Sequence, residues 1–175
     1  MKVQRAIFVF MLIGLGLATT SFTQTVKTDY DRHANFSRYK TYSWTKVETA
    51  SPFWVDRIMN AVNKELAGKG WTQVAKGGDV SIAAVEITRE HSAVLTYYSG
   101  APSWQNSDEG SGNPYVVKRE QVGTLVVQLF DNGTKKLVWR GSSANTLSGK
   151  SKNNIKNFDK GVQELFEHFP PKPQD

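Results

Sequence analysis

The sequence predicts a single α+β domain: a largely antiparallel β-sheet with two amphipathic helices packed on one face. Two observations lead to this fold class. Several short segments alternate polar and apolar residues, which is typical of strands with one buried face. Two longer segments repeat apolar residues every three or four positions, which is typical of helices with one apolar stripe. With 39 % apolar and 22 % charged residues, the 175-residue chain is expected to build one buried core.

The N-terminal third is predicted to hold two strands and the first helix. Residues 25–30 (TVKTDY) alternate as a strand does, and so does the second half of residues 36–44 (FSRYKTYSW). Ser51 and Pro52 are typical of the N-cap and the first position of a helix, so the helix is expected near 52–67. Its apolar stripe contains Trp54, Ile58, Ala61, Val62 and Leu66.

The middle of the chain is predicted to hold strands on either side of a long loop. Residues 71–74 and 80–88 form a short and a longer apolar strand. Between residues 89 and 119 the pattern disappears, and about 97–115 is rich in Gly, Ser, Asn and Pro, which indicates a flexible loop.

The C-terminal third is predicted to be a hairpin followed by a helix. Residues 122–130 and 136–143 are the two strands, and Asp131-Asn132-Gly133-Thr134 is the turn, because Asn-Gly tolerates positive φ. A helix is expected near 154–168, and residues 170–175 form a frayed tail after it. From both helices we expect these side chains to be buried: Trp54, Ile58, Val62, Phe158, Val162 and Phe166.

The first 23 residues have the layout of a signal peptide. Lys2 and Arg5 precede an uncharged apolar run over residues 6–17, and a small polar stretch follows. Cleavage is predicted after Thr23, with Ala18 and Thr20 as alternatives, or the segment stays as an uncleaved anchor. The protein is thus expected to be exported, with residues 24–175 as its one domain. No later apolar run is long enough for a transmembrane helix.

Composition excludes several classes of site. The chain has no cysteine, which rules out disulfides, thiol chemistry and a lipid anchor on cysteine. The net charge of +6 comes from scattered residues rather than the clustered stripe that nucleic-acid binding needs, so no nucleic-acid partner is predicted. The three histidines are isolated in the sequence, and no metal or cofactor site is predicted.

An ordered set of short segments resembles the bacterial domain-of-unknown-function family DUF4136. The segments are VKTDYD (26–31), ANFSRYKTYSW (34–44), Lys69-Gly70-Trp71, Gly78-Asp79-Val80, GTLVVQLFD (123–131), LVWRG (137–141) and Phe169-Pro170-Pro171. The resemblance implies an exported α+β envelope protein, often a lipoprotein, and it supplies no catalytic residues. This chain departs from the lipoprotein members because it lacks cysteine.

Two groups of residues have the types and spacing of catalytic sites. Residues 144–151 (ANTLSGKS) fit a loosened phosphate-loop pattern, but a phosphate loop needs a parallel sheet, whereas the preceding strands are predicted to be an antiparallel hairpin. Asp29 and Asp31 flank Tyr30 on one strand and are the candidate acid–base pair of a metal-independent periplasmic hydrolase. This hydrolase is the alternative function; the leading prediction is a non-enzymatic binding or structural module, periplasmic or secreted.

Aromatic residues cluster in or beside the predicted loop and are the candidate partner contacts: Tyr97, Tyr98, Trp104 and Tyr115. Rigid rings on a loop supply contact area at low entropic cost, so they could bind an envelope protein or a cell-wall component. The alternative is that the same rings fold onto the sheet as a lid.

Overall fold

The computed structural model describes residues 24–96 and 115–172, with side chains described for 24–92 and 119–172. These residues form one six-stranded sheet in the order β1-β6-β5-β4-β2-β3. The strands are β1 (Thr25–Tyr30), β2 (Thr41–Glu48), β3 (Thr72–Gln73), β4 (Val80–Thr96), β5 (Tyr115–Asp131) and β6 (Leu137–Thr146). The helices are η1 (Phe36–Arg38), α1 (Phe53–Gly68) and α2 (Ser151–Phe166).

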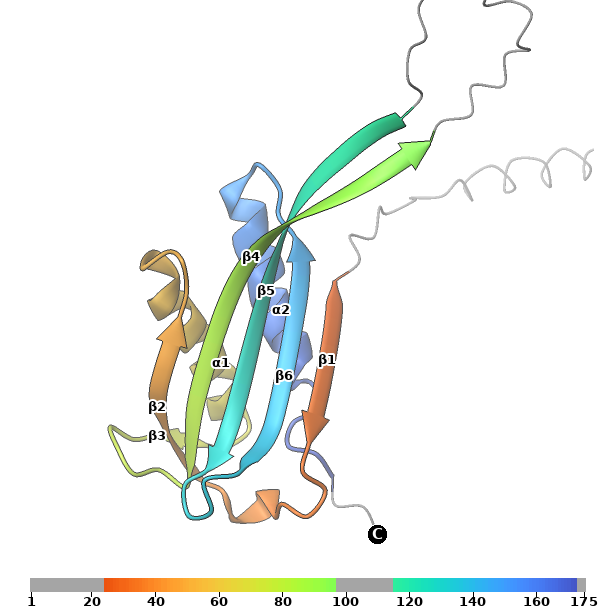
Figure 1. Cartoon of the computed structure of the whole chain (residues 1–175). Helices are drawn as coiled ribbons and strands as arrows, with labels where there is room; N and C mark the ends of the chain where they lie inside the picture. Colours follow the sequence, from red (N-terminus) through yellow and green to blue (C-terminus); the bar gives the residue numbers. More distant parts are fainter. Residues whose placement is uncertain (1–23, 97–114, 173–175) are drawn as a thin grey trace, which may run out of the picture.

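The two long helices lie side by side on one face of the sheet, and no helix among the described residues covers the opposite face (Figure 1). The α2 helix packs against β6 and β1, and α1 packs against β2, β3 and α2. The predicted α+β fold class is therefore confirmed.

The sheet is mixed. The pairs β1–β6, β6–β5 and β5–β4 are antiparallel, as expected, but β2 pairs in parallel with both β4 and β3. The parallel pairing follows from connectivity, because α1 leads the chain back across the sheet between β2 and β4.

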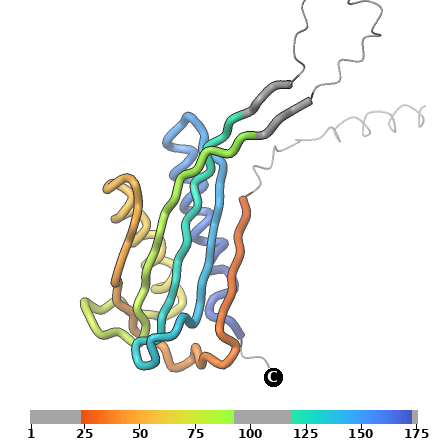
Figure 2. The backbone as a smooth tube through the Cα atoms, viewed as in Figure 1, coloured from red at the N-terminus to blue at the C-terminus, as the bar shows by residue number. Residues whose placement is uncertain are grey.

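The strands β4 and β5 are much longer than predicted. They continue past the end of β6, where Val122 pairs with Thr146, as a two-stranded ribbon that projects from the sheet (Figures 1 and 2). Polar residues dominate its first pairs, such as Glu90 with Gln121 and His91 with Glu120. No helix of the described residues covers the ribbon, so burial does not impose on it the apolar alternation used to predict strands. The loss of that pattern after residue 89 was therefore wrongly interpreted as the end of the strand.

The hairpin between β5 and β6 is confirmed, but its turn differs from the prediction. The positive φ lies at Lys135 (61°), whereas Asn132 and Gly133 keep negative values. The side chain of Asp131 accepts a hydrogen bond from the Thr134 N–H at 2.7 Å and so holds the turn. The α2 helix also begins earlier than expected, at Ser151, and His168 lies beyond its end.

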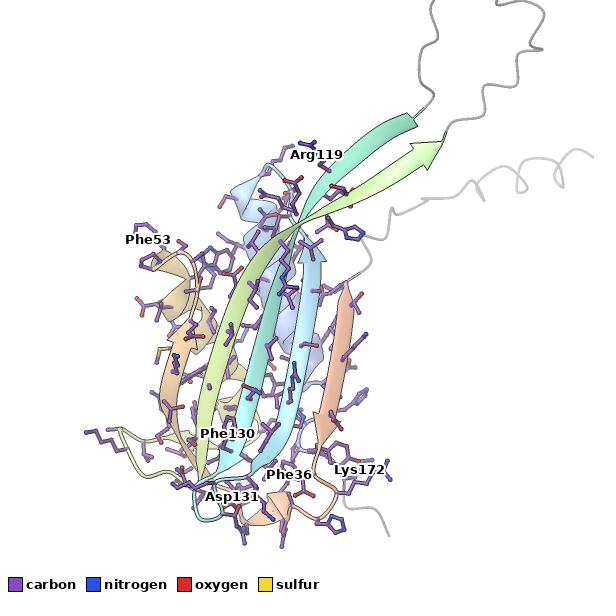
Figure 3. All side chains as sticks on the ribbon, in the orientation of Figure 1. Phe36, Phe53, Arg119, Phe130, Asp131 and Lys172 are labelled. Atoms are coloured by element: carbon purple, nitrogen blue, oxygen red, sulfur yellow. The ribbon has the colours of Figure 1, made fainter. Side chains whose placement is uncertain are left out.

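Along the strands, the side chains on the helix-covered face change from large apolar residues to smaller or polar ones. At the end near the β5–β6 turn, β4, β5 and β6 present Ile82, Leu129 and Trp139, which are all buried. At the end from which the ribbon projects, the same strands present smaller or polar residues, namely Glu86, Thr88, Gly123, Ser143 and Asn145. We call the first the closed end and the second the open end; Asp131 and Phe36 mark the closed end and Phe53 and Arg119 the open end in Figure 3.

Candidate ligand-binding cavity

The closed end is filled by a cluster of six aromatic residues, namely Phe36, Tyr39, Trp71, Trp139, Phe166 and Phe169. All six are at most 7 % exposed. Trp139 and Phe166 stack with ring centroids 5.1 Å apart, and the other ring pairs meet edge to face. The rings pack closely against one another. A hollow of about 640 Å³ borders the outer edge of the cluster, where Trp139 and Phe169 line it together with β1 residues such as Val26.

A buried carboxylate with a complete set of donors lies beside this cluster. Asp131 accepts hydrogen bonds from the Tyr39 hydroxyl at 2.7 Å and from the Thr134 N–H, and it pairs with the Arg38 guanidinium. These donors, Tyr39 first, hold the pKa of Asp131 well below its usual range. Burial and the bond to Asp131 raise the pKa of Tyr39 to about 12. These contacts assign Asp131 a structural role: one of its carboxylate oxygens accepts from Tyr39 and Arg38, and the other accepts from the Thr134 N–H.

At the open end, a cavity of about 260 Å³ lies between the two helices and the sheet. We call it the helix–sheet cavity. Its apolar wall consists of Trp54, Leu125, Leu147, Phe158 and Val162. Its polar wall includes Ser51, Glu86, Thr88, Ser143, Asn145 and Asn154.

The cavity explains why Trp54 and Phe158, which were predicted to lie in the core, are not fully buried. Ile58, Val62, Val162 and Phe166 are buried as expected. In contrast, Trp54 and Phe158 are only half-buried and meet each other edge to face, with centroids 5.0 Å apart. The helical spacing correctly predicts that both point towards the sheet. The small residues opposite them, such as Thr88 and Gly123, leave the space unfilled.

Two polar groups of the cavity wall retain unused hydrogen-bonding capacity. Glu86 accepts one bond at each carboxylate oxygen, from the Thr49 hydroxyl at 2.8 Å and the Thr88 hydroxyl at 3.0 Å. An ionised carboxylate can accept about four. Ser143 is 4 % exposed, and its hydroxyl has no hydrogen-bond partner. The α2 helix lies close over it: a Cβ on Gly161 would come within 2.5 Å of the Ser143 Oγ.

The predicted acid–base pair does not lie in this cavity. Asp29 is exposed on β1 and accepts a bond from the neighbouring Tyr30 N–H. Asp31 accepts a bond from the His33 N–H and lies 3.4 Å from the His33 ring, which is 98 % exposed. The two carboxylates therefore face solvent and are not enclosed with a second catalytic group.

The other sequence-based candidates do not form the predicted sites, although Asn145, Leu147 and Ser151 of the candidate phosphate loop do line the cavity. Residues 144–146 belong to β6, whose neighbours β5 and β1 are both antiparallel, so the sheet expected for a phosphate loop is absent from this part of the described chain. Ser148 and Lys150 instead hold the start of α2, where Ser148 bonds to Asn154. The candidate contacts Tyr97, Tyr98 and Trp104 lie outside the described residues, as does the side chain of Tyr115, the first residue of β5.

Within the described residues, no group of three His, Cys, Asp or Glu side chains is placed to hold a metal ion. Among the same residues, no helix combines the length and the apolar character needed to cross a membrane. The predicted signal peptide, residues 1–23, and the end of the predicted tail, residues 173–175, lie outside the described part.

The match to a family model covers almost the whole domain. Residues 26–171 match the model of DUF4136, a domain of unknown function. The chain belongs to the DUF4136 family. This confirms the resemblance carried by the ordered segments. No curated protein matches this DUF4136 chain.

Solved structures share the fold of this DUF4136 protein. A PDZ domain protein from Parabacteroides distasonis is 13 % identical, with a TM-score of 0.53; the match covers 85 % of this chain but only 36 % of that one. A PelC dodecamer from Paraburkholderia phytofirmans is 12 % identical, with a TM-score of 0.50, over 82 % of this chain and 96 % of that one. At these identities the likeness concerns the fold alone.

Sequence reasoning missed the helix–sheet cavity because its residues come from five separate segments. The signal available was the change in residue size along β4, β5 and β6, from Ile82 and Leu129 to Thr88 and Gly123. That change is informative only once strand order and register are known.

Proposed function

We propose that this DUF4136 protein is a non-enzymatic protein of the cell envelope that binds a small, mainly apolar molecule in the helix–sheet cavity. The observation that carries the proposal is the cavity itself, about 260 Å³ in volume, with the half-buried rings of Trp54 and Phe158 in its wall. Ligand sites in proteins are mostly apolar concavities with a few well-placed polar groups.

The volume limits the size of the ligand. An apolar cavity of about 150 Å³ is large enough to bind benzene. The helix–sheet cavity is larger than that but smaller than the roughly 300–1,000 Å³ of pockets for drug-sized molecules. A single ring with a short substituent, or one end of a larger envelope molecule, therefore fits this space.

The polar groups of the cavity favour binding over catalysis. Glu86 is held by two threonine hydroxyls, and within the described part of the chain neither a histidine nor a second carboxylate lines the cavity with it.

The envelope location is supported by the N-terminal pattern, in which Lys2 and Arg5 precede the apolar run of residues 6–17. Mass spectrometry of the protein recovered from its host's envelope tests this part. The expected N-terminus lies after Thr23, whereas an intact Met1 on a cytosolic form would contradict it.

Binding is tested by titrating toluene into the protein and following its NMR spectrum. We expect saturable shifts for the wild type and their loss in Val162→Phe, because the larger ring fills the cavity from α2. Val26→Phe is the matched control: Val26 is a half-buried valine on β1 that does not line the cavity. Saturable binding in Val26→Phe and none in Val162→Phe supports the proposal. No binding of toluene to the wild type overturns it.

A further inference from the structure

We propose that Glu86 makes the helix–sheet cavity selective for small organic cations, with a primary ammonium group on a short apolar body. This inference rests on the proposed function, because it assigns a ligand class to the same cavity. The observation behind the inference is that the Glu86 carboxylate lies in a mainly apolar site without a counter-ion.

Among the residues that the structure describes, Glu86 is the only charged side chain that lines the cavity. It has no ion-pair partner among the described residues, although the chain carries a net charge of +6. Its two hydrogen bonds come from the neutral hydroxyls of Thr49 and Thr88, which position the carboxylate without neutralising it. A carboxylate can only accept hydrogen bonds when ionised, so a ligand must offer it a donor.

The rest of the wall suits the body of such a ligand. Glu86 pairs across the sheet with Leu125, so an ammonium group at Glu86 places its apolar substituent over Leu125 and towards Trp54 and Phe158. The rings of Trp54 and Phe158 give this apolar substituent a surface to pack on. Arg57, whose guanidinium lies 5.6 Å from the Trp54 ring centroid, does not line the cavity and leaves Glu86 unpaired.

Anions are a poorer match, although both long helices begin at this end. Helix N-termini attract anions through backbone N–H groups that have no partner. Here the first-turn N–H groups of Trp54 and Val55 in α1 are already bonded to Ser51 and Pro52, and those of Asn153 and Asn154 in α2 are bonded to Lys150. An anion would also face the full charge of Glu86.

The test compares three probes of similar size: benzylamine, which is protonated at neutral pH, benzyl alcohol and benzoate. Affinities are measured by NMR titration for the wild type and for Glu86→Gln, which keeps the shape of the side chain and removes its charge. Glu167→Gln is the control for net charge, because Glu167 is exposed just beyond α2 at the closed end.

We expect the wild type to bind benzylamine most tightly and benzoate least. Glu86→Gln should weaken benzylamine binding about tenfold or more, as expected for a bond to a charged group, and leave benzyl alcohol unchanged. Glu167→Gln should behave as the wild type does. The wild-type ranking alone tests the inference if Glu86→Gln does not fold.

The outcomes separate this inference from the proposed function. Equal binding of benzylamine and benzyl alcohol, with no effect of Glu86→Gln, overturns the selectivity and leaves the cavity as a binding site. Preferred binding of benzoate also overturns it. If none of the probes nor toluene binds, both the inference and the proposed function fail.

Discussion

The closed and open ends of this DUF4136 domain use the same strands and helices but fill their space differently. At the closed end, Asp131 has three donors, and the rings of Trp139 and Phe166 stack with no space between them. At the open end, Ser143 lacks a partner, and Phe158 remains half-buried beside the cavity. The difference indicates that the closed end contributes most of the packing that holds the fold together, whereas the open end leaves the space to which our proposal assigns a ligand.

Truncating one phenylalanine at each end gives the largest expected contrast. Phe166 is fully buried in the aromatic cluster, so Phe166→Ala should lower the free energy of unfolding by about 3–5 kcal/mol. Phe158→Ala should cost only about 1–2 kcal/mol, because its ring already borders an unfilled cavity and loses fewer contacts. Chemical denaturation measures both values. Equal losses would show that the two ends are packed alike.

Removing the charge of the buried carboxylate is expected to have the next largest effect. Asp131→Asn weakens the bonds from Tyr39 and Arg38, which should cost about 2–3 kcal/mol. Asp29→Asn is the matched control on exposed β1, and it should change stability by less than about 0.5 kcal/mol. A loss in Asp131→Asn no larger than that in the control would refute the structural role of Asp131.

The same carboxylate makes stability depend on pH in acid. Because the pKa of Asp131 is lowered in the folded state, its contribution is fully present above the unfolded value of about 3.9. It is lost as the pH falls from there towards the folded value. The difference in stability between the wild type and Asp131→Asn should therefore shrink below about pH 4. A difference that stays constant down to pH 2 or grows in acid would contradict this assignment.

The smallest effects come from deleting one buried hydroxyl at each end. Tyr39→Phe removes a donor from Asp131 and should cost about 1–2 kcal/mol. Ser143→Ala removes a hydroxyl that has no partner, so stability should stay within about 0.5 kcal/mol or rise slightly. The two melting curves compare the ends directly. A larger loss for Ser143→Ala than for Tyr39→Phe would reverse the account.

Sequence patterns predict the elements of this fold better than their pairing. The three-to-four spacing correctly places Ile58, Val62, Val162 and Phe166 in the core, because it reports which helix face turns inward. It cannot report how large the facing residues are, so Trp54 and Phe158 were expected to be as buried as the others. Their partial exposure depends on the strands opposite, where Gly123 and Ser143 are small.

The other differences between the sequence predictions and the structure have the same cause, because each involves contacts between segments that are distant in the sequence. The parallel pairing of β2 with β4 brings Tyr42 beside Val80, and no local pattern encodes the direction of that pair. The role of Asp131 depends on Tyr39, which is 92 positions away in the sequence. From the chain alone, Asp131 is identified only as a turn residue.

The central claim, that ligand binding belongs to the open end, is tested most directly by locating a bound probe. Methyl NMR spectra recorded during a toluene titration report on valine and leucine side chains at both ends. We predict saturable shifts for Leu125, Leu147 and Val162, which line the cavity, and none for Leu129 or Val80 near the closed end. Shifts centred on Leu129 and Val80, or no saturable shift at Leu125, Leu147 and Val162, would contradict the account.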